Sequence, residues 1–413
     1  MQTLPRLSAN ASQRAAELTA VAAAQAAIAR MVGASPMDIQ TFLRDLHAQH
    51  AFPRIALNEL SQFGQPGQPY LGATLLPERR VPRNEYTETG VRYRTTVAND
   101  GSRYSPAQRK GKGVLVGSVP VVLGDSDIKT DFTAHDLDAV LEMILPIATL
   151  QTPAGMQAAA AVLGWGQAAL NNALIERNEI QRFQALVDGK VIRRGDNDFY
   201  EEVVYPNPDG HRVAAGGDWT DPEYNILGDL LAMKRKLATK GGTVTRMLGS
   251  TAVLGLMLAN QSLAKAAGKA IITVAPGGTL TQTAAAFSED DLTALLRANG
   301  LPAFEVYDRT YFLDDGTTGR FMPEDAVILA CTTGRDERVA LANDPNTFRL
   351  VQNTLGYTAV GRAVGQLTPG RVIQVTYFSN KPPRLEGEAW QSSLPVILDP
   401  ESFGVITDIT LPG

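Results

Sequence analysis

The 413-residue sequence contains one cysteine and four histidines, and this scarcity excludes several kinds of site. Cys331 alone cannot form an intrachain disulfide, nor can it supply a zinc or iron–sulfur site that needs several thiolates. Because it ends the apolar run 327–330, we expect a small buried hydrophobe rather than a nucleophile. His211 follows the turn pattern Asp209-Gly210, so we expect it to be solvated in a loop. The sequence therefore predicts no metal site and no cofactor.

Long hydrophobic runs are also missing. The apolar stretch 251–259 is far shorter than the ~20 residues that a membrane-spanning helix needs, so we expect no membrane contact. Glu17 and Gln25 interrupt the alanine-rich segment 15–29, which favours a helical arm over a secretory leader. A formal net charge of −5 argues against a chain that binds nucleic acid through an overall positive charge.

The familiar catalytic motifs are missing as well. Residues 111–117 resemble a dinucleotide-binding loop, but the third glycine is one residue late and a strand rather than a helix follows. Residues 267–270 lack the upstream glycine and the hydroxyl residue of a phosphate-binding loop. Asp314-Asp315-Gly316 is typical of a turn between strands rather than of paired catalytic carboxylates. We expect no catalytic residues.

What the sequence does contain is a pattern of helices and strands typical of an α+β fold. Two β-rich segments, 91–97 and 114–119, flank an Asp100-Gly101 turn and predict a long two-stranded ribbon. Thr152-Pro153 begins a long helix that we expect to run to about Leu186. Its apolar face carries three leucines at helical spacing, which we expect to face a sheet of the same subunit: Leu163, Leu170 and Leu174.

Later segments complete this pattern. Residues 221–330 read as a compact α/β unit, whose first helix has apolar residues at i, i+4, i+7 and i+11 and ends at Gly241. Ser288 and Asp291 match a capping box at the start of another helix, which Gly300 ends. Residues 372–378 and 394–398 are again typical of strands.

Charge is distributed unevenly along the chain. Residues 78–113 contain nine basic and four acidic residues, a net charge of +5, whereas residues 187–223 contain nine acidic and four basic residues, a net charge of −5. A two-stranded ribbon is marginally stable by itself. It could bind nucleic acid, since Tyr93 and Tyr104 lie among its arginines. It could also be a solvated hairpin, or it could lie on the acidic segment of a neighbouring copy.

The order of parts resembles the Hong Kong 97 fold of tailed-bacteriophage major capsid proteins, and within it the lambda-like major capsid protein E family. The resemblance begins near Tyr70, and order and spacing carry it more than any single motif. The supporting segments are Tyr70-Leu71-Gly72, Leu75-Leu76-Pro77, Ser105-Pro106-Ala107, Gly300 to Asp308, Tyr311 to Gly316, Arg320 to Pro323, Pro382-Pro383, Trp390, Leu394 to Leu398 and Phe403.

This resemblance implies a division of the chain and a set of contacts between copies. The implied parts are an arm with the alanine-rich helix (1–77), an extended loop (78–132), a peripheral domain with a spine helix (133–220), an axial domain (221–349) and a return to the peripheral domain (350–413). We expect the basic residues of the loop to contact an adjacent subunit: Arg92, Arg94, Arg103, Arg109 and Lys110. The expected acidic partners are Asp196, Asp198, Glu201 and Glu202.

The family resemblance also implies the function. We expect a non-enzymatic protein that assembles into pentamers and hexamers of an icosahedral head in the host cytoplasm and becomes part of the virion. The implied partners are a separate scaffolding protein, a portal, a decoration protein and packaged double-stranded DNA, bound non-specifically at most. Two alternatives stay open: a soluble homo-oligomeric α+β enzyme, and a cellular nanocompartment shell of the same fold.

Overall fold

The computed structural model describes thirteen stretches of the chain. These are residues 70–93, 114–133, 135, 166–194, 200–239, 242–274, 280–284, 287–313, 316–332, 338–341, 344–350, 355–378 and 384–410. They belong to two compact units. The first unit takes its described residues from Asp125–Glu176 and Gly361–Ser392. The second takes them from Gly67–Gly124, Arg177–Val360 and Ser393–Gly413. The alanine-rich helix, the tip of the basic ribbon and the first half of the long helix lie outside the described residues.

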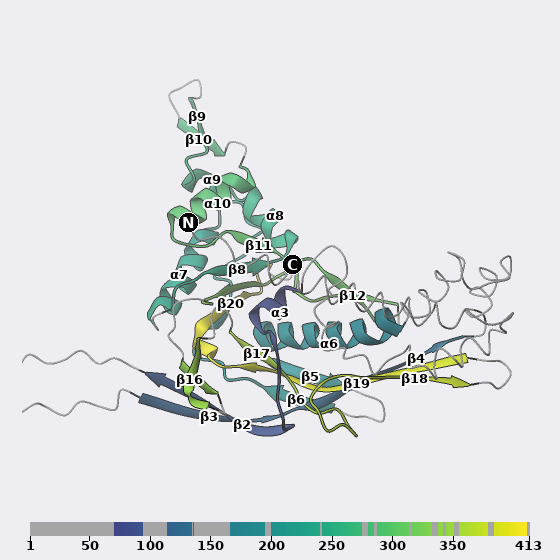
Figure 1. Cartoon of the computed structure of the whole chain (residues 1–413). Coiled ribbons are helices and arrows are strands. Elements are labelled where there is room, and N and C mark those ends of the chain that lie inside the picture. The colour runs from purple at the N-terminus through teal and green to yellow at the C-terminus, as the bar shows by residue number, and fades with distance from the viewer. Residues whose placement is uncertain are drawn as a thin grey trace, which may run out of the picture. The chain divides into compact units, whose positions relative to one another are not determined.

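The second unit contains a mixed five-stranded sheet in the order β11-β8-β14-β20-β7. The strands are β7 (Arg212–Ala214), β8 (Arg246–Gly249), β11 (Phe304–Val306), β14 (Val327–Ala330) and β20 (Phe403–Thr407). Strand β14 is antiparallel to both of its neighbours, and each outer strand is parallel to the strand beside it. Figure 1 shows helices packed around this sheet: α7 (Ile226–Thr239), α8 (Thr251–Ala259), α9 (Gln261–Ala266) and α10 (Glu289–Ala298).

Two helices of this lobe, α7 and α10, form where the sequence pattern predicts them. On α7 the buried residues are Ile226, Leu230, Met233 and Leu237, which are the i, i+4, i+7 and i+11 positions. Ser288 and Asp291 form a reciprocal capping box at the start of α10, and Gly300 follows this helix with a left-handed φ of 67°. The core also contains Trp219 and Cys331. The expectation that Cys331 is buried is confirmed, with 5% of its surface exposed.

The prediction for His211 is wrong. Only 3% of this residue is exposed, and its Nδ1 lies 2.9 Å from the carbonyl oxygen of Phe403. The cause is the next strand, since β7 begins at Arg212 and pairs with β20, and Val405 donates its backbone N–H to the His211 carbonyl. A long-range strand pairing therefore carries the histidine inside.

A second sheet is built around the long strand β19 (Arg384–Ile397). In the second unit, β17 (Gly356–Val360) pairs antiparallel with residues 393–397 of β19 and parallel with β1 (Glu78–Arg80). In the first unit, β18 (Val372–Phe378) pairs antiparallel with residues 384–390 of β19, and β4 (Gly124–Phe132) also pairs with β19.

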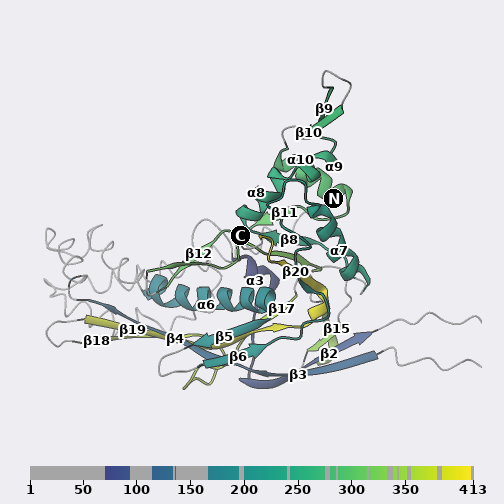
Figure 2. The same ribbon diagram turned by 180° about the vertical axis from the view of Figure 1, so that it is seen from behind.

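The base of the basic ribbon is an antiparallel pair, as predicted. Strands β2 (Glu85–Tyr93) and β3 (Val114–Val122) pair from Glu85↔Val122 to Tyr93↔Val114. Figure 2 shows them running out past β15 (Arg338–Leu341), which pairs with β16 (Asp344–Leu350). The second unit also contains these smaller elements: α3 (Leu71–Leu75), the hairpin β5–β6 (Lys190–Arg194, Tyr200–Val204), the hairpin β9–β10 (Ala270–Val274, Leu280–Ala284) and the hairpin β12–β13 (Thr310–Phe312, Thr318–Arg320).

The described half of the long helix runs from residue 166 to residue 188. It consists of a π-helical turn (Gly166–Asn171), α6 (Asn172–Phe183) and a second π-helical turn (Gln184–Asp188), and Gly189 ends it with a φ of 71°. Leu170 and Leu174 are buried, and the first π-helical turn packs on β18. This agrees with the expectation that the apolar face of the helix packs on a sheet of the same subunit. Leu163 lies outside the described residues.

We expect Leu170→Asp to destabilise the protein by more than about 3 kcal/mol, because it places an unpaired carboxylate in apolar surroundings. Leu170 is fully buried. The matched control is Asn172→Asp, which adds the same charge two residues away at a half-buried position. Thermal unfolding and the soluble fraction measure the effect, and equal stability of the two variants would show that this helix face is exposed.

We expect Cys331→Ala to lower the free energy of unfolding by about 1 kcal/mol, in the range of small deletions in a core. Its thiol is packed closely, since a Cβ at Gly242 would lie 2.8 Å from Sγ. Assembly should be unchanged and insensitive to reductant. Fast labelling of the native thiol would contradict the buried position.

Candidate assembly surface

Two tyrosines, one in the ribbon and one in β17, hold the base of the basic ribbon to the rest of the second unit. The hydroxyl of Tyr357 donates to Glu88 Oε2 at 2.8 Å and lies 2.8 Å from the hydroxyl of Tyr86. The Arg79 guanidinium lies over the Tyr357 ring, 4.7 Å from its centroid. Burial raises the pKa of Tyr357, so this hydroxyl stays a donor at neutral pH. The ribbon therefore leaves from a fixed base.

Apolar packing supports the same base. Val81, Val121 and Leu123 belong to a buried cluster with residues of β17 and β19. Within this cluster the exposed fractions of the three side chains are 8% or less. The start of the extended loop is thus a part of the core rather than a free hairpin.

A buried ion pair on α6 holds three distant segments together. Glu179 and Arg182 are 0% and 1% exposed, and their charged groups are 3.0 Å apart. Glu179 also accepts the backbone N–H of Gly72 at 2.7 Å and the hydroxyl of Tyr307 at 3.0 Å. Arg182 donates to Thr358 Oγ1 at 2.8 Å. This pair thus joins the segment before the ribbon, the α/β lobe and β17.

Tyr70, the first described residue, packs in an aromatic cluster that also contains Tyr307, a partner of Glu179. The Arg309 guanidinium lies 3.7 Å from the centroid of the Tyr70 ring and donates to the Tyr70 hydroxyl at 2.8 Å. Phe321 contacts the Tyr70 ring edge to face, and Phe183 of α6 stacks on Tyr307. The residues that precede the ribbon are therefore anchored over the helix.

Glu179 and Arg182 were not among the residues predicted from the sequence. The signal that could have found them is their spacing, since they lie three residues apart among the apolar positions of a long helix. Charged residues on an expected apolar face are costly unless they are paired. Their partners, by contrast, lie more than 100 residues away in the sequence, and no local pattern identifies them.

The structure describes only some of the expected contact residues. Arg92 lies in β2 opposite Leu115, and its side chain is outside the described part. Six further residues lie outside it entirely: Arg94, Arg103, Arg109, Lys110, Asp196 and Asp198. Contact between the basic and acidic sets is expected between copies, so it stays a prediction.

Glu201 and Glu202 of β6 have cationic partners within their own chain. Glu201 lies 2.8 Å from the guanidinium of Arg193, which is 3% exposed and also donates to the Ser393 carbonyl. Glu202 lies 3.3 Å from Lys190 Nζ. Hydrogen bonds from Tyr200 and Lys190 hold the pKa of Glu202 below its ordinary value. The charges of both carboxylates are thus already partly balanced within their own chain.

Within the described part of the chain, no three His, Cys, Asp or Glu side chains lie together as metal ligands. In the same residues, no helix is both long and apolar enough to cross a membrane.

Comparison with known proteins decides the family. Residues 129–359, more than half of the chain, match the family described as phage major capsid protein E. The chain belongs to this family. It is a major capsid protein, a structural component of the phage head and hence of the virion.

Solved structures similar to this chain include two phage-related proteins. A putative capsid protein of an Escherichia coli CFT073 prophage has a TM-score of 0.50 and 14% identity, over 88% of this chain and 99% of that one. A phage-related protein from Bordetella bronchiseptica RB50 has a TM-score of 0.45 and 15% identity, over 92% and 100% of the two chains. No curated protein matches the sequence. The α+β fold of this capsid protein is of the Hong Kong 97 type, as expected.

We expect Glu179→Ala to destabilise this capsid protein by about 3–5 kcal/mol. Arg182 loses its fully buried partner and keeps only the partly exposed carboxylate of Glu78, 3.4 Å away. The Gly72 N–H and the Tyr307 hydroxyl also lose their acceptor. The matched control is Glu223→Ala, which breaks an exposed ion pair with Lys265 and costs about 0–1 kcal/mol. Denaturant unfolding of both variants measures the difference. Equal losses would show that the buried pair is not the centre of the fold.

Proposed function

We propose that the subunits assemble into pentamers and hexamers of an icosahedral head around double-stranded DNA, and that each subunit lays its basic ribbon on a neighbour. The observation that carries the proposal is the ribbon itself. Its base is held by Tyr86, Tyr357 and buried apolar residues, while a two-stranded ribbon beyond such a base is marginally stable in water. A neighbouring copy supplies the missing surface.

The charges indicate where on the neighbour the ribbon lies. Residues 78–113 have a net charge of +5, and a complementary surface sets the register of the contact more than its affinity. Glu201 and Glu202 already have partners in their own chain. We therefore give the main role to Asp196 and Asp198, which follow β5 in the sequence, and a supporting role to the carboxylates of β6.

The other parts of the proposal follow from the family. Residues 221–349 form the axial domain, and residues 133–220 with 350–413 form the peripheral domain. The protein has no enzymatic activity and no cofactor. Its further partners are a separate scaffolding protein, a portal, a decoration protein and DNA held non-specifically, and assembly takes place in the host cytoplasm. The match to a phage family favours this function over a nanocompartment shell or an enzyme.

We expect Arg92→Glu combined with Arg94→Glu to block or misdirect assembly while leaving the subunit folded. Each lost pair is partly exposed and worth about 0–1 kcal/mol, but the contact recurs in every subunit. Adding Asp196→Lys and Asp198→Lys to the same chain should partly restore particles. The matched control, Arg92→Lys with Arg94→Lys, keeps the charge and should assemble. Sedimentation and negative-stain imaging of the chain produced with its scaffold provide the measurement.

Two results would overturn the ribbon contact. The first is normal assembly of the reversed variant at every salt concentration. The second is a particle structure with Arg92 and Arg94 against the DNA, more than a Debye length of about 10 Å from any acid of a neighbour. Either result would leave the capsid function itself intact.

A further inference from the structure

Two of the exposed hydrophobic side chains stand out from the rest of the described residues. Leu367 and Phe312 are 89% and 81% exposed, the highest values among the large hydrophobic residues there. Each has a second exposed apolar residue nearby in the sequence, Val364 at 67% and Leu313 at 48%. Single exposed hydrophobic residues are ordinary. Two pairs of neighbouring exposed hydrophobic residues, each on an ordered segment that projects from the fold, indicate surfaces that bind a partner.

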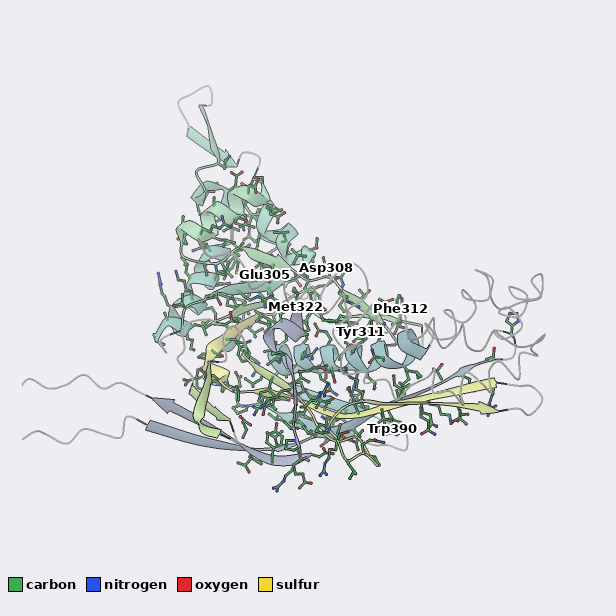
Figure 3. All side chains as sticks on the ribbon, in the orientation of Figure 1. Glu305, Asp308, Tyr311, Phe312, Met322 and Trp390 are labelled. Atoms are coloured by element: carbon green, nitrogen blue, oxygen red, sulfur yellow. The ribbon has the colours of Figure 1, made fainter. Side chains whose placement is uncertain are left out.

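Phe312 is held outward by a small rigid hairpin. Strands β12 and β13 pair from Thr310↔Arg320 to Phe312↔Thr318. The Tyr311 ring packs on Phe321 with centroids 5.0 Å apart, so the next side chain along the strand points to the opposite face. A Cβ at Gly319 would lie 2.3 Å from the Tyr311 ring, which explains the glycine there. Figure 3 shows Tyr311 and Phe312 on this hairpin.

Leu367 and Val364 lie on a loop that is also preformed. The loop runs from Gly361 to Arg371 and is closed by a bond from the Gly370 N–H to the Gly361 carbonyl at 3.0 Å. The indole N–H of Trp390, labelled in Figure 3, donates to the Val364 carbonyl at 3.1 Å. Since both projections are already ordered, docking them costs little conformational entropy.

The two projections have neighbouring sequence of opposite charge. Asp314 and Asp315 directly follow Leu313 in the sequence. Residues 361–371 contain Arg362 and Arg371 and no acidic residue. Like projections would repel each other, whereas unlike projections attract. The rings of a shell need heterologous interfaces, in which each chain carries both of two different complementary surfaces.

We infer that Phe312 and Leu313 of one subunit dock on Val364 and Leu367 of a neighbouring copy. This inference rests on the proposed assembly of copies into capsomers. It names a contact separate from the basic ribbon and gives it one occupant, a second copy of this chain. The apolar side chains supply affinity, and the flanking charges select the unlike surface.

A disulfide between two differently marked chains tests the contact, because such a bond needs Cα atoms within about 7 Å. One chain carries Phe312→Cys, the other carries Leu367→Cys, and both carry Cys331→Ala. The two are mixed before assembly with scaffold, oxidised as particles and separated without reductant. We expect a covalent dimer that contains one chain of each kind. The matched control replaces Leu367→Cys with Val204→Cys, which is similarly exposed and should give no dimer with the first chain.

Loss of the aromatic side chain tests the energy of the contact. Phe312→Ser should lower the association constant of this contact at least about tenfold, since the ring no longer leaves water on docking. The thermal midpoint of the unassembled subunit should not change, because Phe312 lies outside the core. Phe312→Leu should retain most of the assembly.

The remaining outcomes each overturn the inference. Particles without a dimer between the two marked chains would overturn it while leaving the proposed function standing. A bond formed only within one chain that carries both cysteines would place the surfaces together inside a subunit. Loss of a scaffolding or decoration protein from Phe312→Ser particles, with no cross-link between copies, would give the hairpin a different partner. A chain that forms no particles under any condition would overturn both proposals.

Discussion

The buried pair of Glu179 and Arg182 is the constraint on which the second unit depends. Moving two charges out of water is expensive, and the cost is recovered only when every donor and acceptor finds a partner. Here Glu179 accepts hydrogen bonds from Gly72 and Tyr307, which lie 107 and 128 residues away in the sequence. Arg182 donates a hydrogen bond to Thr358, which lies 176 residues away. The helix can therefore bury these charges only when all three segments are in place. This requirement selects one arrangement of the unit.

The basic ribbon and the β12–β13 hairpin both project from rigid parts of the second unit. The ribbon leaves from a base fixed by Tyr86 and Tyr357, and the β12–β13 hairpin leaves from the aromatic cluster that contains Tyr70 and Phe321. If these bases were flexible, forming each contact between copies would cost additional conformational entropy, because the base would have to become ordered on binding. A buried polar network and an aromatic cluster at these bases thus lower the entropy cost of the proposed contacts.

Local patterns predicted the elements but not what joins them. The apolar spacing of α7, the capping box of Ser288 and the paired strands of the ribbon depend on neighbouring residues, and the structure has each of them. The position of His211 depends on the pairing of β7 with β20, nearly 200 residues away, and there the expectation was wrong. Glu179 was missed for the same reason. The acidic set of the candidate site was chosen by charge alone, which does not reveal that Arg193 and Lys190 balance two of its four members.

Charged and apolar contacts have different effects in a closed shell. Exposed ion pairs are weak and screened by salt, so they set register and let wrong contacts dissociate. Burial of an aromatic side chain is stronger and less sensitive to salt, but it selects poorly between apolar surfaces. A contact that combines the two can be specific and still reversible. Because one chain supplies both halves of each heterologous interface, a single substitution is repeated at every such contact around a ring. With the proposed contacts at Phe312 and Arg92, small changes in free energy there would be multiplied across the assembly, and assembly would be more sensitive to them than the folding of one subunit.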